Sequence, residues 1–199
     1  MQIILATTSP YRKEAFAFLK IPFIVKGSEV DESKLKGIHR NDPRDLVFAL
    51  AKAKAEAVAK NYKKMLNKDA IVFGFDSVGI FEGKFLDKPK SREQAFDRLK
   101  RMSGNMHEFI TGVYVINTKT GKTISRLVKT IIYFRDFSDE EINKYLDEDE
   151  LYKTLAAAYN ALNHYSATFA KRIDGSPHNL LSGLPLEIIP EILNEALRE

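Results

Sequence analysis

The 199-residue chain contains no cysteine. This absence excludes disulfide bonds, a thiol nucleophile and any metal site built on thiolates. A metal ion, where one is used, must be held by oxygen or imidazole ligands, and oxygen ligands favour hard divalent cations.

Long hydrophobic runs are absent as well. No run of about eighteen apolar residues occurs, and residues 1–6 lack the basic and apolar regions of a signal peptide. We therefore expect a cytoplasmic protein without a membrane partner. The formal net charge is only +4, and the lysine cluster at 60–68 lies at an expected helix end, where a solvated face is the ordinary explanation. We expect no nucleic acid partner.

The composition that is present is that of a folded globular protein. Hydrophobic residues make up 44% of the chain and charged residues 29%, which is too apolar for intrinsic disorder. The length can bury a substantial core, as one domain or as two small lobes that share a cleft.

Hydrophobic periodicity predicts strands that alternate with helices early in the chain, followed by a long hairpin. Strands are expected at 2–6, 22–26 and 70–75, with a hairpin turn at 82–83 and two further strands joined near 119–122. Helices are expected after Ser9, Asp42, Ser91 and Ser138 and at the end of the chain, whereas 151–173 fits either a helix or a strand. We therefore predict an α/β fold, a single domain over 1–199 with a mixed central sheet, flanking helices and two lobes around a cleft.

The segment "ILATTSPYRKEAF" joins the first expected strand to the first expected helix. Ser9 can cap that helix, and Pro10 suits its first position. The unpaired N–H groups of a helix N-terminus can bind an anion, which Arg12 and Lys13 would reinforce. The alternative is that Ser9 is only a cap and that the two cations are surface residues.

Two charged residues follow expected strands. Asp76 comes directly after "IVFGF", where ligands of open α/β sheets gather, although it could instead cap a turn. Lys88 lies in "DKPKS", on a backbone that proline stiffens, although a lone surface lysine is usually unremarkable. A polar loop, "SEVDES", adds the carboxylates of Glu29, Asp31 and Glu32. In combination, these groups suit metal-assisted attack on a polyphosphate.

The order of five motifs resembles the Maf-like nucleotide pyrophosphatases over nearly the whole chain. The motifs are "LATTSPYR", "EVDES" with "LAKAKA", "FDSVGIFEGKFLDKP", "MSGNMHEFITGVYV" and "LSGLPLEII". The resemblance implies a hydrolase that splits a nucleoside triphosphate into the monophosphate and pyrophosphate with a divalent cation, Mg²⁺ or Mn²⁺. It also implies a homodimer and a fold related to that of inosine triphosphatases.

The same resemblance implies a role for each matching residue. Asp76 would be the proton acceptor that helps to activate water, and Glu32 would help it to hold the metal. Lys88 would complete the catalytic set and contact phosphate. The expected substrate-binding residues are Ser9, Tyr11, Arg12, Lys54 and Ser77.

Three positions depart from the family pattern and leave the substrate open. Tyr11 replaces an arginine, as in the subgroup that acts on methylated guanosine triphosphate, but Ser77 is not that subgroup's glutamine. Leu162 falls at a polar position of the family, with Asn163 beside it. A methylated guanosine triphosphate and dTTP or UTP therefore both remain candidates.

Two other functions stay open: a nucleotide-binding regulator linked to cell division with weak or lost catalysis, and an inosine or xanthosine triphosphatase. His107 matches a family histidine. His39, His164 and His178 have no partner at metal-ligand spacing, so we interpret them as structural or surface residues.

Overall fold

The computed structural model describes residues 1–39, 42–148, 150–161 and 165–198. The chain divides into two compact units: unit 1 comprises residues 1–77, 110–128 and 182–199, and unit 2 comprises residues 78–109 and 129–181. Strands β3 (Ala70–Phe81), β5 (Met106–Asn117) and β6 (Thr123–Phe134) run from one unit into the other. In the described ranges, no helix has the length and apolar character needed to cross a membrane.

The described strands form one seven-stranded mixed sheet, which confirms the predicted fold class. The order is β2-β1-β3-β5-β6-β7, and β4 pairs with β3. Strands β1 (Gln2–Ala6) and β2 (Phe23–Lys26) run parallel, and β1 also runs parallel to β3. Strand β4 (Lys84–Leu86) forms an antiparallel hairpin with β3, with Glu82 and Gly83 at positive φ in the predicted turn.

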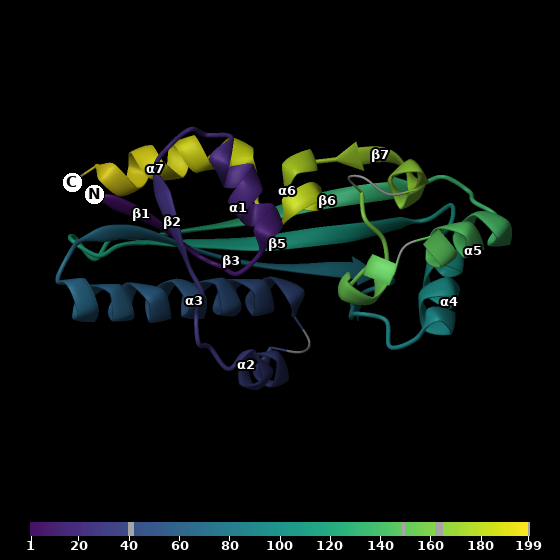
Figure 1. The fold of residues 1–199 in the computed structure, drawn as a ribbon, viewed down its shortest axis with the longest axis horizontal. Coiled ribbons are helices and arrows are strands. Elements are labelled where there is room, and N and C mark those ends of the chain that lie inside the picture. Colours follow the sequence, from purple (N-terminus) through teal and green to yellow (C-terminus); the bar gives the residue numbers. More distant parts are fainter. Residues whose placement is uncertain (40–41, 149, 162–164, 199) are drawn as a thin grey trace. The chain divides into compact units, whose positions relative to one another are not determined.

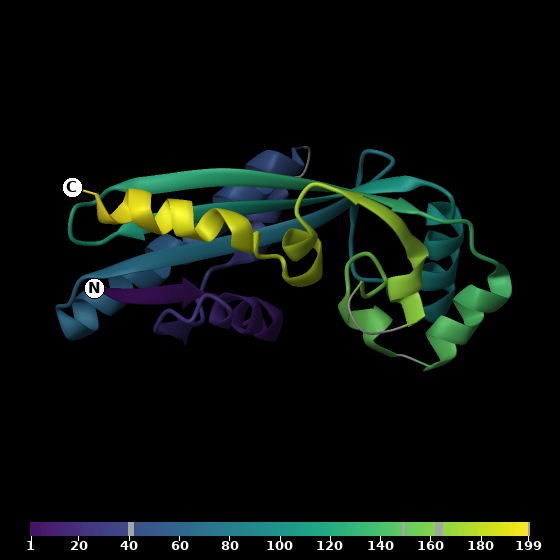
Figure 2. The ribbon, with the colours of Figure 1, turned by 90° about the horizontal axis from the view of Figure 1, so that it is seen from above.

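Helices cover both faces of the sheet in unit 1. Figure 1 shows α3 (Pro43–Leu66) on one face, and α1 (Pro10–Ala17) and α7 (Ile189–Leu197) on the other. Figure 2 shows α7 alongside the hairpin of β5 and β6. Along β1, Ile3 and Leu5 pack with α1 and α7, whereas Ile4 and Ala6 pack with α3. This alternation is the period of two that a strand imposes.

The same alternation places the polar residues of β3. Phe73 and Phe75 pack in the core with α1 and α7, so Ser77 faces that side, whereas Asp76 faces α3. Gly74 lets α3 approach the sheet, because a Cβ at this position would lie 2.0 Å from the carbonyl oxygen of Ala51. Side chains of α3 can therefore reach β3 directly.

Unit 2 is built around aromatic side chains. It contains β4, α4 (Arg92–Met102), α5 (Asp139–Glu148), two short 3₁₀ helices (Glu150–Thr154 and Tyr165–Phe169), β7 (Ala170–Asp174) and most of α6 (Pro177–Ser182). Helices α4 and α5 lie side by side (Figures 1 and 2). Phe134, Phe137 and Phe169 pack ring to ring in the core of this unit.

Two expectations were wrong in detail. Asp76 does not lie at the end of its strand, because β3 continues to Phe81; however, β1 pairs with β3 only as far as Gly74, so Asp76 lies just beyond the end of β1. The segment "SEVDES" is not only a loop, since Asp31 caps a short helix, α2 (Glu32–Ile38), with a hydrogen bond from the Ser33 backbone N–H. Glu32 therefore has a helical backbone.

Candidate active site

A polar cavity of about 180 Å³ lies in unit 1, where β1 ends and α1 begins. Its volume is too small for a whole nucleotide but suits a phosphate group. The backbone and side chains around it come from β1, the loop to α1, the loop after β2, α2 and α3. The cavity is lined by Ala6, Thr7, Thr8, Ser9, Arg12, Ser28, Glu32 and Lys54.

The N-terminus of α1 forms one wall of this cavity. Ser9 has an extended backbone, and its Oγ accepts a hydrogen bond from the backbone N–H of Arg12 at 3.4 Å. The Thr7 Oγ1 accepts a hydrogen bond from the Ser9 N–H at 3.1 Å. The predicted cap is therefore confirmed, whereas anion binding at this helix start stays a prediction. The positive end of the helix dipole next to the cavity favours an anion there.

Lys54 joins two carboxylates at the opposite wall. Its Nζ lies 2.7 Å from Asp76 Oδ1 and 2.8 Å from Glu32 Oε1. The side chains of Lys54 and Asp76 are both only 13% exposed, so this ion pair is largely withdrawn from water. Lys36 supports Glu32 from one turn further along α2, at 3.0 Å. The two carboxylates thus converge on one ammonium group.

Burial and ion pairing act on the acidity of both carboxylates. Burial is the strongest influence on Asp76 and raises its pKa, although the Lys54 ammonium and the Arg12 guanidinium act in the opposite direction. Burial also acts to raise the pKa of Glu32, but hydrogen bonds from Lys54 and Lys36 outweigh it and lower that pKa. The pKa values of the two carboxylates are therefore shifted in opposite directions.

Arg12 holds the strand on both sides of Asp76. Its Nη1 donates to the carbonyl of Phe75 at 3.3 Å, and its Nη2 donates to Ser77 Oγ at 2.9 Å. Its Nε donates to the carbonyl of Gly183 at 3.0 Å. Burial lowers the pKa of Arg12, while Asp76 and Glu32 act to raise it. Arg12 lines the cavity, yet three of its N–H groups already bind protein oxygens.

Thr111 is a site residue that sequence reasoning missed. It is fully buried on β5, and its Oγ1 lies 2.7 Å from Ser77 Oγ. The hydroxyl of Ser77 is therefore fixed between Thr111 and Arg12. The one sequence signal for Thr111 was the alternation of side chains along "ITGV" in β5, which could have placed Thr111 on a buried face of the sheet. Nothing in the sequence indicates the Gly183 carbonyl as an acceptor.

The structure brings Ser9, Arg12, Glu32, Lys54, Asp76 and Ser77 together in unit 1. Tyr11 is exposed on the first turn of α1. Lys88 belongs to unit 2, where its side chain is exposed after β4. The alternatives Leu162 and Asn163 lie outside the described residues. The structure places the other residues, and the role of each one stays a prediction.

The cluster around Lys54 could offer a metal ion two carboxylate ligands, Asp76 and Glu32. Among the described residues, no group of three or more histidine, cysteine, aspartate or glutamate side chains has metal-binding geometry. Magnesium commonly binds through one or two carboxylates together with substrate phosphates, rather than in a cage made only of protein ligands. Asp76 and Glu32, which already converge on one cation, fit that type of site.

Comparison with known proteins agrees with this arrangement of motifs. The chain is 36% identical over 195 residues to a dTTP/UTP pyrophosphatase of Clostridium novyi, covering 98% of this chain and 97% of that protein. It is 33% identical over 191 residues to a 7-methyl-GTP pyrophosphatase of Thiobacillus denitrificans, covering 96% and 90%. The Staphylococcus aureus Ham1 protein is 14% identical, covers 70% of this chain and 73% of its own, and has a TM-score of 0.34, a likeness too small to bear on the fold. The Maf-like protein family matches residues 2–196, and the chain belongs to this family.

Proposed function

We propose that the protein hydrolyses a nucleoside triphosphate to the nucleoside monophosphate and pyrophosphate. The observation that carries this proposal is the bridge from Lys54 to both Asp76 and Glu32, beside the N-terminus of α1. Phosphoryl transfer requires positioning and neutralisation of oxygen charge more than covalent chemistry. The names of relatives over the full chain support the same reaction.

Each wall of the cavity has a part in this reaction. The partial positive charge at the start of α1 and the hydroxyl of Ser9 would attract and hold phosphate oxygens. Lys54 would neutralise charge on the same phosphate. Asp76, whose pKa burial raises, would accept the proton of the attacking water and be closer to the optimum for a base than an ordinary aspartate. Arg12 would keep the backbone on both sides of Asp76 in place through the Phe75 carbonyl and the Ser77 hydroxyl.

Asp76 and Glu32 are the proposed ligands of a divalent cation, Mg²⁺ or Mn²⁺. Such an ion, when bound, would neutralise charge on the phosphate oxygens at the reacting centre. Glu32 has the lowered pKa that a metal-binding carboxylate needs, because it must stay ionised. The absence of cysteine leaves oxygen and imidazole as the available ligand types.

The test is a panel of nucleotides with Mg²⁺ or Mn²⁺. The names of the relatives make dTTP, UTP and 7-methyl-GTP the first substrates to try, and inosine and xanthosine triphosphates test the related activity. We expect one pyrophosphate and one monophosphate for each triphosphate consumed. Tight binding without turnover would favour the nucleotide-binding regulator, and release of inorganic phosphate with a diphosphate would refute the proposed bond.

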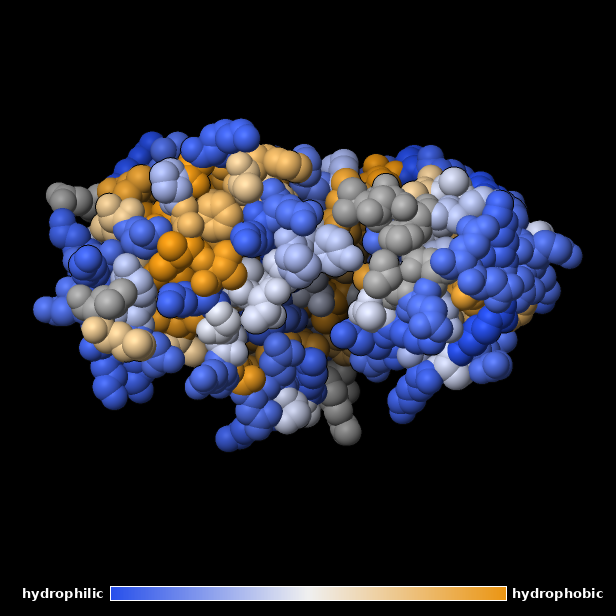
Figure 3. All heavy atoms as spheres, viewed as in Figure 1, coloured by the Kyte–Doolittle hydropathy of each residue, from blue (hydrophilic) through white to orange (hydrophobic). Residues whose placement is uncertain are grey.

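We also propose a homodimer that acts in the cytoplasm. Strand β2 lies at the edge of the sheet, and its residues Phe23, Ile24 and Val25 are only half-buried. Figure 3 shows apolar surface over this strand. An exposed apolar edge strand is a common place for a second chain to associate. Light scattering coupled to size exclusion would give twice the monomer mass, and a monomer at working concentration would contradict the proposal.

A further inference from the structure

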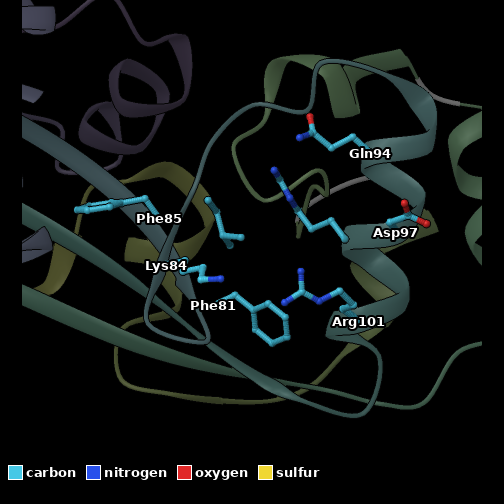
Figure 4. Close-up of a pocket in the computed structure, with 8 residues that line it drawn as sticks. Phe81, Lys84, Phe85, Gln94, Asp97 and Arg101 are labelled. Atoms are coloured by element: carbon cyan, nitrogen blue, oxygen red, sulfur yellow. The ribbon is translucent and has the colours of Figure 1, made fainter. Parts of the chain in front are cut away.

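A second cavity, of about 370 Å³, lies entirely within unit 2. It is formed by the end of β3, the strand β4 and one face of α4 (Figure 4). This volume is at the lower end of the range for small-molecule sites. The cavity is lined by Phe81, Lys84, Phe85, Leu86, Gln94, Asp97, Arg98 and Arg101.

Positive charge predominates among the charged residues of the lining, with Lys84, Arg98 and Arg101 against Asp97. Figure 4 shows the Lys84 ammonium and the Arg101 guanidinium directed into the same space next to the Phe81 ring, whereas the Asp97 carboxylate points away from them. Arg101 is balanced by an ion pair with Glu82 and lies 5.8 Å from the centre of the Phe81 ring. In the described parts of the chain, Lys84 has no such ion pair.

Arg98 is the second cation without a carboxylate in contact. It is half-buried, and its Nη1 donates hydrogen bonds to the backbone carbonyls of Asp87 and Ala156. Burial lowers the pKa of Arg98, because the charged guanidinium loses water, and the charge of Asp87 acts in the opposite direction without reversing the shift. Among the residues that the structure describes, the Nε and Nη2 donors of this side chain make no hydrogen bond.

We propose that this cavity binds a phosphate-type oxyanion, either inorganic phosphate or pyrophosphate. An anion between Lys84 and Arg98 would supply the missing opposite charge, and the planar fork of an arginine matches phosphate oxygens. Phe81 and Leu86 give the cavity a buried apolar wall, and charge attraction is stronger beside such a wall than in open water. A concave site of this size suits a small anion better than an extended polyanion.

Arg98 connects this cavity to the backbone next to Lys88, the proposed catalytic lysine. Arg98 binds the carbonyl of Asp87, the residue directly before Lys88. An oxyanion that fixes Arg98 would therefore also fix the backbone that carries Lys88. This consequence rests on the proposed function, whereas binding of the anion does not.

Binding is tested by NMR titration without divalent cations, so that no turnover occurs. Sodium pyrophosphate is added to the wild type, to Lys84→Met and to Lys171→Met, a matched loss of charge on the exposed strand β7. Lys84 is exposed, so its replacement leaves the core of unit 2 intact. We expect the side-chain amide of Gln94 to shift with saturation in the wild type and Lys171→Met, and binding about tenfold weaker in Lys84→Met.

Parallel titrations with inorganic phosphate and with UTP distinguish the source of the anion. A stronger response to free pyrophosphate or phosphate would support a free anion, and a stronger response to UTP would identify the phosphate tail of a nucleotide. Unchanged Gln94 signals in all three titrations, or equal affinities for the wild type and Lys84→Met, would overturn the site. Loss of nucleotide hydrolysis alone would not, because the readout is independent of turnover.

Discussion

The two units bury polar groups in opposite ways. In unit 1, Asp76 and Lys54 are nearly buried and pair as opposite charges. In unit 2, His107 Nε2 and the hydroxyl of Tyr159 lie 2.9 Å apart within an aromatic core. Burial lowers the pKa of His107 to about 4 and raises that of Tyr159, so both side chains are neutral at physiological pH.

This difference distinguishes a cluster suited to catalysis in unit 1 from a pair that contributes to packing in unit 2. A buried charged cluster costs desolvation free energy and is retained where an anion, a metal or a proton must be handled. A neutral hydrogen-bonded pair packed against the Phe134 ring satisfies His107 Nε2 and the Tyr159 hydroxyl and adds specific ring contacts, whereas His107 Nδ1 is buried without a hydrogen-bond partner among the described residues. Changes to the unit 1 cluster should therefore alter activity most, whereas changes to the unit 2 pair should alter stability most.

The largest effect is expected for Asp76→Asn. It removes the proposed proton acceptor while keeping the size of the side chain, so kcat for pyrophosphate release should fall by about 10²–10⁴-fold. The matched control is Asp174→Asn, which removes an exposed, ion-paired carboxylate in unit 2 and should leave kcat unchanged. Steady-state kinetics check both variants. An Asp76→Asn enzyme with the kcat of the wild type would contradict the expected contrast between the units.

The next effect is loss of stability in acid through His107. Because the folded-state pKa is lowered to about 4, the unfolded chain binds the proton more readily. This contribution is fully present above the ordinary histidine pKa of about 6.5 and is lost as pH falls to about 4, roughly 3 kcal/mol in total. Urea unfolding at a series of pH values measures it.

The histidine variants test the origin of that acid sensitivity. His107→Asn should lose less stability than the wild type over this pH range, because it has no group to titrate there. His39→Asn removes a histidine from the end of α2 and should follow the wild type. Parallel curves for all three proteins would show that acid destabilises the protein elsewhere.

A smaller effect is expected for Lys54→Met. It leaves two carboxylates without their shared cation and removes a hydrogen bond to charged groups, so kcat/KM should fall by about 10–100-fold. The missing ammonium should also raise the pKa of Asp76 further, which moves the acid side of the activity profile to higher pH. Lys52→Met on the same helix, where Lys52 lies 4.0 Å from Glu56 and is 49% exposed, should behave as the wild type.

The smallest effect is expected for Thr111→Val, which tests the uncharged part of the unit 1 network. The substitution keeps the shape and removes the hydrogen bond to Ser77, for a loss of about 1 kcal/mol in unfolding free energy. Activity toward the preferred nucleotide should change by less than about threefold. A loss as large as that of Asp76→Asn would place Thr111 in the catalytic machinery.

Local patterns predicted most of the fold. The strand at Gln2–Ala6 and the cap at Ser9 were confirmed because an apolar run and a helix cap depend only on neighbouring residues. The end of β3 was missed because Asp76 and Ser77 interrupt the apolar run, while pairing with β4 extends the strand to Phe81. The stretch 151–173 stayed ambiguous because its described parts form short 3₁₀ helices and the start of β7.

The site was only partly predictable, because its contacts join residues that lie far apart in the sequence. The pattern around Ser9 and Arg12 indicated an anion-binding helix start, but it did not indicate that Arg12 donates to the Phe75 and Gly183 carbonyls. The contact between Lys54 and Asp76 depends on the close approach of α3 at Gly74. Without the family resemblance, no spacing rule would have paired these residues.

The most direct test of the account is the pH dependence of kcat for the wild type and for the residual activity of Asp76→Asn. The account predicts that wild-type kcat falls about tenfold per pH unit on the acid side of an apparent pKa above the ordinary aspartate value, and that Asp76→Asn lacks this decrease. The same acid decrease in both proteins, or a flat wild-type profile, would contradict the role of the buried carboxylate.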